Sequence, residues 1–137
     1  MRNSLSVLYV EDDVNSQSIM SFLLTEALGL KHVTIFENSD NFMSRVHALT
    51  PRPEVILLDI HLKPYNGFEM LQMLRADPAF NDTPIVALTA SVMNEEVQQL
   101  KTAGFNGVIA KPIDIDTFPM LLERVLNGEA IWGLVHA

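Results

Sequence analysis

The chain has 137 residues, 48% of them hydrophobic, which suits one globular domain with a core of its own. Its formal net charge of -8 argues against nucleic acid as a partner, because binding to a phosphate backbone needs clustered lysine and arginine. The absence of cysteine excludes disulfides, thiolate catalysis and cysteine-based metal sites, and it is compatible with a reducing compartment. The apolar runs are too short to span a membrane and no signal-peptide pattern follows Met1, so we expect a cytoplasmic protein without a membrane partner.

Five short apolar runs alternate with amphipathic stretches along the chain. The runs are LSVLYV from 5, HVTIF from 32, EVILL from 54, PIVAL from 84 and GVIA from 107. Apolar runs of this length are typical of strands that are buried on both faces. The alternation predicts an α/β fold in which five strands form one doubly wound parallel sheet, with right-handed crossovers and helices on both faces.

The first two helices are placed by acidic residues, polar caps and a proline. The first is expected directly after Asp12 and Asp13, and the second near Asn38 or Ser39, with Pro51 as its stop. Helical spacing predicts that the buried side of the first helix holds Ile19, Phe22, Leu23, Ala27 and Leu30.

The last three helices have equally local signals. The third is expected to end at Asp77-Pro78, and the fourth to run from about Met93 to Ala103 with Gly104 as a left-handed cap. The fifth is expected to start near Asp116, because Pro119 then falls among the amides that lack a helical partner anyway.

No composition break indicates a second domain. We expect one domain over residues 1–128 and a C-terminal tail over 129–137 with an apolar stretch around Trp132. The tail either folds back onto the domain, which we favour, or forms a partner surface that supports a weak dimer of an otherwise monomeric protein.

Polar residues stand at the ends of four of the five apolar runs. They are Glu11-Asp12-Asp13 after the first run, Asp59 after the third, Thr89-Ala90-Ser91 at the fourth and Lys111-Pro112 after the fifth. In an open parallel sheet the carboxyl ends of the strands share one edge, where ligands bind. The pattern therefore predicts a site at that edge.

The carboxylates at this edge call for a cation. Two like charges about 4 Å apart repel by roughly 4 kcal/mol at an effective dielectric of about 20. Oxygen ligands suit Mg2+, and Asp12, Asp13 and Asp59 could supply them. Asp59 then becomes a candidate nucleophile toward phosphorus, while Lys111 and Thr89 would hold the phosphoryl oxygens.

Taken singly, each of these residues has an ordinary structural explanation. Asp12 and Asp13 precede a helix and could be N-caps, and Asp59, Thr89 and Lys111 could be strand-end or surface residues. Their joint occurrence at one edge of one sheet favours a site.

At these positions the sequence resembles the receiver domain of two-component response regulators of the stand-alone, chemotaxis-regulator type, over residues 5 to about 127. The matching motifs are VEDD at 10–13, LLDIHL at 57–62, NG at 66–67, LTAS at 88–91 and AKPID at 110–114. The resemblance implies a flavodoxin-like (βα)5 fold with strand order 2-1-3-4-5. It also implies that Asp59 accepts a phosphoryl group from a sensor histidine kinase or phosphotransfer protein. Such a protein is not an enzyme on other substrates and catalyses only its own phosphorylation and dephosphorylation.

The resemblance also implies residue roles. Asp13 would be the direct Mg2+ ligand, Asp12 would act largely through water, and His61 would bind through its backbone carbonyl. Thr89 and Lys111 would contact the phosphoryl group, with a cis Lys111-Pro112 peptide directing the lysine. The resemblance further implies that the His61 side chain points outward and, like Ser91, modulates phosphoryl lifetime. A role for this side chain as metal ligand or general base is disfavoured, because none of the four histidines forms a chelating pair.

Two departures from the family pattern bear on the switch. Receivers usually carry Tyr or Phe three residues before the lysine, and this chain has Val108 there. The proline that often follows the acceptor by four residues is replaced by Lys63, with Pro64 next to it. A valine cannot turn inward as the aromatic residue does. Either phosphorylation is therefore coupled to the change of shape through Thr89 and backbone shifts, or the protein changes shape little on phosphorylation.

Several functions are compatible with these features. The favoured one is a receiver that signals by phosphorylation-dependent binding of an output protein to its fourth helix, fifth strand and fifth helix. The alternative is a phosphorelay shuttle that passes the phosphoryl group onward. A phosphatase or phosphotransferase is disfavoured because His61 stands where those enzymes usually have a second acid. The chain could also be a piece of a larger hybrid kinase.

Overall fold

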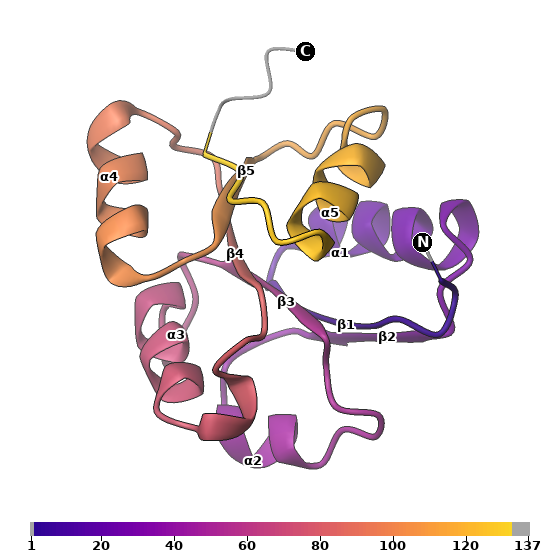
Figure 1. The fold of residues 1–137 in the computed structure, drawn as a ribbon, viewed down its shortest axis with the longest axis horizontal. Helices are drawn as coiled ribbons and strands as arrows, with labels where there is room; N and C mark the ends of the chain where they lie inside the picture. The colour runs from indigo at the N-terminus through magenta and orange to yellow at the C-terminus, as the bar shows by residue number, and fades with distance from the viewer. Residues whose placement is uncertain (1, 133–137) are drawn as a thin grey trace.

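The computed structural model describes residues 2–132 and contains one parallel sheet of five strands (Figure 1). The strands are β1 (Ser6–Val10), β2 (His32–Phe36), β3 (Val55–Asp59), β4 (Ile85–Thr89) and β5 (Gly107–Ala110). Their order is β2-β1-β3-β4-β5, and every neighbouring pair is parallel. The predicted fold and strand order are therefore confirmed.

Burial explains why the apolar runs became strands. All residues of β1, β3 and β4 are buried, because these strands lie inside the sheet and have helices on both faces. The edge strand β2 is mostly half-buried, and its first residue, His32, is exposed. A continuous apolar run thus marks the inner strands, as the sequence predicts.

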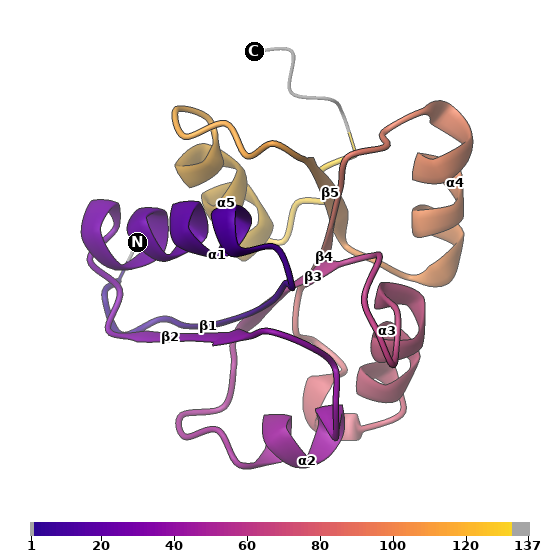
Figure 2. The same ribbon diagram turned by 180° about the vertical axis from the view of Figure 1, so that it is seen from behind.

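Helices cover both faces of the sheet. They are α1 (Val14–Ser21), which continues as the π-helical turn η1 (Phe22–Ala27), α2 (Phe42–His47), α3 (Gly67–Arg75), the 3-10 turn η2 (Pro78–Phe80), α4 (Asn94–Ala103) and α5 (Phe118–Leu126). In Figures 1 and 2, α1 and α5 lie on one side of the sheet and α2, α3 and α4 on the other. The core is correspondingly split into two apolar clusters, one under each set of helices. Among the described residues, none of the helices has the length and apolar character needed to cross a membrane.

The buried side of the first helix differs from the prediction. Phe22 is 53% exposed and Ala27 is exposed, whereas Met20 and Leu24 are buried beside Leu23. Met20, Leu23 and Leu24 have the i, i+3, i+4 spacing of one helix face. Phe22 is two positions from Met20 and from Leu24, so it points to the opposite side.

The second helix begins later than predicted. It starts at Phe42, with Asn41 in the left-handed region at φ 48° as its N-cap. Ser39 cannot cap it, because the Ser39 hydroxyl is buried and bridges the backbone of Tyr65. That hydroxyl accepts from the Tyr65 N–H at 2.7 Å and donates to the Tyr65 carbonyl at 2.8 Å.

The later helices follow their sequence signals closely. Asn66 and Glu69 form a capping box at the start of α3. Gly104 ends α4 at φ 110°, as predicted, and α5 begins at Phe118 with Pro119 in its first turn. Proline is tolerated there because the first amides of a helix have no internal partner.

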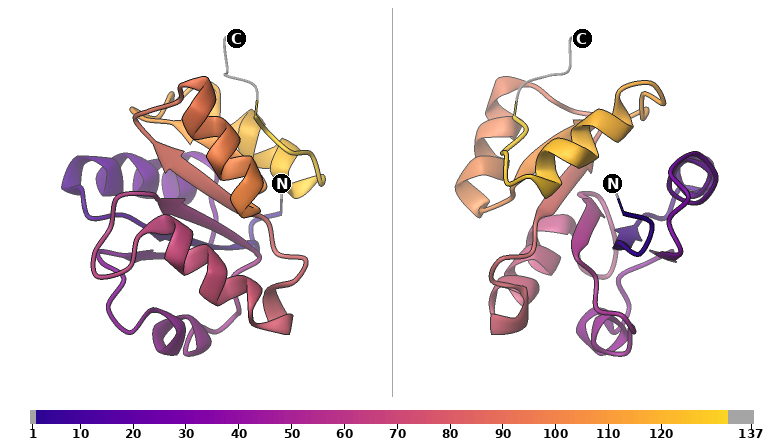
Figure 3. Two further views of the ribbon diagram at one scale, coloured as in Figure 1. Left: turned by 90° about the vertical axis from the view of Figure 1, so that its left-hand side faces the viewer. Right: turned by 45° about the vertical axis from the view of Figure 1, so that its right-hand side comes forward.

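After α5 the chain turns back along the sheet. Ile131 forms a parallel bridge with Gly107 of β5 and is only 1% exposed. Figure 3 shows this segment running between α4 and α5. Ile131 and Trp132 therefore pack on the domain, as the favoured interpretation of the tail expects, and residues 133–137 lie outside the described part of the chain.

We predict that Gly67→Ala lowers the free energy of unfolding by about 1–3 kcal/mol. A Cβ atom at Gly67 would lie 2.9 Å from Ile60 Cα and 3.0 Å from the Asp59 carbonyl oxygen, and backbone atoms cannot move aside cheaply. Urea unfolding measures the loss. Gln72→Ala, at an exposed position of the same helix α3, is the matched control, and its cost should stay within about 0.5 kcal/mol. Equal losses for the two variants would contradict this account.

Candidate functional site

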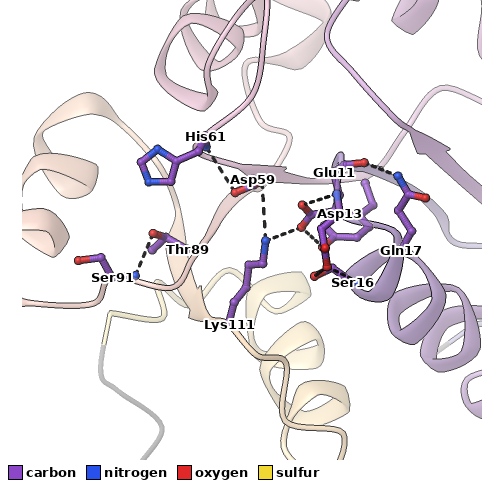
Figure 4. A network of polar contacts seen from close by, with 10 residues as sticks. Glu11, Asp13, Ser16, Gln17, Asp59, His61, Thr89, Ser91 and Lys111 are labelled. Carbon is purple, nitrogen blue, oxygen red and sulfur yellow. Dashed lines mark hydrogen bonds and ion pairs between the residues drawn. The ribbon is translucent and has the colours of Figure 1, made fainter.

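The polar strand ends converge as predicted. Glu11 follows β1, Asp59 ends β3, Thr89 ends β4 and Lys111 follows β5. The strand order makes these four strands consecutive neighbours, so their carboxyl ends share one edge. Figure 4 shows Lys111 extending to a position between Asp59 and Glu11.

Three carboxylates gather at this edge. One oxygen each from Glu11, Asp12 and Asp59 lies within 4.8 Å of the others. Glu11 and Asp59 are buried, while Asp12 is exposed. The donor set consists of oxygen atoms alone, which suits a hard cation such as Mg2+.

Asp13 is not part of this group, although it was expected beside Asp12 and Asp59. Asp13 is the N-cap of α1 instead, and its Oδ2 accepts from both the N–H and the hydroxyl of Ser16 at 2.8 Å. These hydrogen bonds hold the pKa of Asp13 below its ordinary value. The ordinary explanation considered for this residue therefore applies.

Glu11 lies in the group of three carboxylates, where Asp13 was expected. Its Oε1 accepts from the Tyr9 hydroxyl at 2.6 Å and from Lys111 Nζ at 2.7 Å, and its Oε2 accepts from the Asp13 N–H at 3.2 Å. Burial opposes ionisation, yet the hydrogen bonds from Lys111 and Tyr9 keep the pKa of Glu11 below its ordinary value. The signal for Glu11 was present in the sequence, because residues two apart on a strand share a face and Tyr9 offers a donor there.

Asp59 is 5% exposed and sits beside this ionised glutamate. Burial, then the neighbouring Glu11, raises the pKa of Asp59 from 3.8 to about 6. Its Oδ2 is 3.7 Å from Lys111 Nζ, and its Oδ1 accepts from the His61 N–H at 3.4 Å. Both contacts oppose the rise.

Lys111 is the cation that the two buried carboxylates share. Burial disfavours its charged form, but the hydrogen bond to Glu11 and the charge of Asp59 outweigh this and raise the pKa of Lys111. The Lys111-Pro112 peptide is cis, as expected. The Lys111 N–H also donates to the Thr89 carbonyl at 2.9 Å, which ties the lysine to β4.

Thr89 and His61 complete the set of predicted residues. Thr89 is 5% exposed, and its hydroxyl accepts from the Ser91 N–H at 3.2 Å. His61 is exposed, and its ring points away from Asp59 and Lys111 in Figure 4, as expected. Its contact with Asp59 is made by the backbone, which leaves the His61 carbonyl as the candidate ligand.

Comparison with known proteins identifies the class to which this fold and site belong. The family model of the response regulator receiver domain matches residues 7–123, so the chain belongs to this family. A probable chemotaxis protein CheY of Rhizobium etli is 30% identical, over 90% of this chain and 94% of that protein.

Two solved structures have the same fold. Chemotaxis response regulator CheY4 of Vibrio cholerae has a TM-score of 0.80 at 27% identity, over 89% of this chain and 98% of that one. The receiver domain of sensor histidine kinase PA1611 of Pseudomonas aeruginosa has a TM-score of 0.78 at 25% identity, over 90% of this chain and 98% of that one. The latter structure has a magnesium ion coordinated in its active site cleft.

The raised pKa of Asp59 predicts a pH-dependent effect of Asp59→Asn. A folded-state pKa above the unfolded value means that protonated Asp59 favours folding, fully below about pH 4, and that this contribution is lost as the pH rises through about 6. Asparagine stays neutral, so in chelator the variant should be about 1–3 kcal/mol more stable than the parent at pH 8 and nearly equal to it at pH 4. Urea unfolding at both pH values measures this, with exposed Asp116→Asn as the control. If the stability gained by Asp59→Asn were the same at both pH values, the raised pKa of Asp59 would be contradicted.

We also predict that Tyr9→Phe destabilises the protein by about 1.5–3 kcal/mol. The change removes only the hydroxyl that donates to the buried carboxylate of Glu11. Tyr65→Phe is the matched control, since Tyr65 is 38% exposed and a surface change of this kind should cost under about 0.5 kcal/mol. Thermal and urea unfolding of both variants would show the difference, and similar losses would refute a special role for Tyr9.

Proposed function

We propose that this protein is a phosphoryl-accepting signalling domain whose acceptor is Asp59, with a sensor histidine kinase or phosphotransfer protein as donor. The observation that carries the proposal is the position of Asp59. Its buried carboxylate lies within 4.8 Å of oxygens from Glu11 and Asp12, and its Oδ2 lies 3.7 Å from Lys111 Nζ. A carboxylate with a purely structural role needs only one positively charged partner. Asp59 has such a partner in Lys111 and is also surrounded by two further acids, which is an arrangement suited to binding a metal ion.

The three carboxylates fit a divalent metal, and we assign Mg2+ to them. Glu11, Asp12 and Asp59 would hold the ion, with the His61 backbone carbonyl as a further ligand. When bound, Mg2+ supplies positive charge that offsets the negative charge of the carboxylates and of the phosphoryl oxygens. The magnesium in the cleft of the Pseudomonas receiver domain supports this assignment.

The residues of the chain do the rest of the chemistry by position. An Asp59 carboxylate oxygen forms the bond to phosphorus while the phosphorus–nitrogen bond of the phosphohistidine breaks, and that electron pair returns to the imidazole. Lys111 is placed to exchange its bond to Glu11 for one to a phosphoryl oxygen, and the Thr89 hydroxyl to donate to another. Hydrolysis by water would later restore the carboxylate. The catalysis that we propose thus acts on the aspartate of the protein itself.

The output that we propose is binding of another protein to α4, β5 and α5. Lys111 directly follows β5, and its N–H donates to Thr89 at the end of β4, so a change at the acceptor reaches this surface through two strands. The net charge of -8 favours a protein partner over nucleic acid. We place the domain at residues 1–128 and its activity in the cytoplasm.

The test is intact mass after incubation with Mg2+ and a small acyl phosphate. We expect one phosphoryl group on the parent protein and none on Asp59→Asn or in chelator. Lys111→Met should reduce the yield at least tenfold, because the phosphoryl charge then lacks its cation. No adduct on the parent protein, together with no Mg2+ binding, would overturn the proposal.

Calorimetry of Mg2+ binding distinguishes the acids. We expect Glu11→Gln and Asp12→Asn to weaken Mg2+ affinity at least tenfold, while Asp13→Asn leaves it within about twofold. Asp13 is the matched control, since it lies next to the site in sequence and caps a helix instead. A loss on Asp13→Asn as large as that on Asp12→Asn would contradict the assignment of ligands.

A further inference from the structure

The outer edge of β5 is occupied by the tail of the chain. The Val108 N–H donates to the Ile131 carbonyl at 3.0 Å, and the Ile131 N–H donates to the Asn106 carbonyl at 3.3 Å. These bonds surround the parallel bridge between Gly107 and Ile131. A short segment of extended chain therefore pairs with an edge strand whose backbone groups would otherwise be open to another chain.

Two consecutive tail residues extend into the two halves of the core. Ile131 is 1% exposed and belongs to the cluster under α1 and α5, whereas Trp132 packs against the cluster that contains Val108 and Leu100. Lys101 of α4 places its Nζ 5.6 Å from the centre of the Trp132 ring. Successive side chains of a strand point to opposite faces, so an aliphatic residue followed by an aromatic one suits this edge. Trp132 thus adds an aromatic group to the cluster that contains Val108.

Gly107 makes the close approach possible. A Cβ atom there would overlap Ile131 Cγ1 and lie 3.1 Å from both the N and the O of Ile131. The three nearest atoms all belong to the tail, so the space beside Gly107 is shaped for a chain lying against β5. A substitution at this glycine would push the tail away before it disturbed the sheet.

We propose that this edge is a docking site for an extended segment of the output protein, and that the tail is its built-in competitor. The segment that fits runs parallel to β5 and carries an aliphatic residue followed by an aromatic one, as the tail does with Ile131 and Trp132. The inference rests on the output surface proposed above. A tethered segment acts at a high effective concentration, commonly millimolar, so a partner must overcome the tail in order to bind.

The consequence for regulation is direct. The tail and a partner segment cannot hold Gly107 and Val108 at the same time, because both need the same backbone groups. The apparent affinity of the edge for the partner is reduced by the fraction of molecules in which the tail has left the edge. Any change that loosens the tail increases this fraction and raises the apparent affinity by the same factor.

Two full-length variants separate the tail from the site. Ile131→Asp releases the tail, because a carboxylate cannot be buried at that position without a partner, and it leaves the edge open. Gly107→Ala also releases the tail but blocks the edge with its new methyl group. Ile115→Asp, at a residue that is 51% exposed, is the matched control for introducing an aspartate.

The probe is an unlabelled peptide of residues 127–133, NGEAIWG, titrated into 15N-labelled protein without Mg2+ or phosphodonor. We expect the amides of Gly107 and Val108 to shift in Ile131→Asp at a peptide concentration at least tenfold lower than in the parent protein or Ile115→Asp. Gly107→Ala should show no such shift. Trp132, the single tryptophan of the chain, should become more accessible to a fluorescence quencher in both tail-releasing variants.

Equal peptide response in the parent protein and Ile131→Asp, with Trp132 released in the variant, would overturn the proposal. Peptide binding to Gly107→Ala as tight as to Ile131→Asp would also overturn it, because the site would then lie elsewhere. Since the experiment contains no phosphodonor, failure here leaves phosphorylation of Asp59 intact. Failure of phosphorylation would equally leave the peptide result standing.

Discussion

The ammonium group of Lys111 lies between two buried carboxylates, and the arrangement of the whole sheet edge depends on that position. Glu11 is fully buried and Asp59 nearly so, and two such charges cannot stay together without a cation. Lys111 bonds to Glu11 at 2.7 Å and faces Asp59 at 3.7 Å. The shorter contact helps to keep Glu11 ionised. Burial and the neighbouring Glu11 raise the pKa of Asp59 to about 6, and the longer contact with Lys111 only opposes this rise.

This unequal sharing suits the phosphoryl transfer that we propose. A phosphoryl group on Asp59 would bring further negative charge, and Lys111 would have to follow it. Tyr9 would make that movement less costly, because its hydroxyl would remain on Glu11 when the lysine leaves. The Tyr9 hydroxyl is 2.6 Å from Glu11 and buried among apolar residues, so Glu11 does not become an unpaired buried charge. Tyr9, Glu11 and Lys111 thus form one unit that links the core to Asp59.

The same strand that positions Lys111 also carries the tail. β5 ends one residue before Lys111, and Gly107 and Val108 on its outer side contact Ile131. In this protein Lys111, whose Nζ faces Asp59, and the edge occupied by the tail are therefore separated by a few residues of one strand. A valine at position 108 fits this arrangement, since Trp132 packs against the cluster to which Val108 belongs and fills space on that side.

The sequence by itself determined the five strands, their order through the family resemblance, and the convergence of Asp59, Thr89 and Lys111, because apolar runs and the residues at their ends are local features. From the sequence we expected Asp12 and Asp13, of the three consecutive acids after β1, to join Asp59, whereas in the structure Glu11 and Asp12 do so. Only the tertiary structure decided that, because Glu11 is held by Lys111, 100 positions away, while Asp13 is held by the nearby Ser16. The exposure of Phe22 and the pairing of Ile131 with β5 were decided in the same way. Both depend on which surfaces meet after the chain has folded, and the spacing of residues along a single helix or tail does not contain that information.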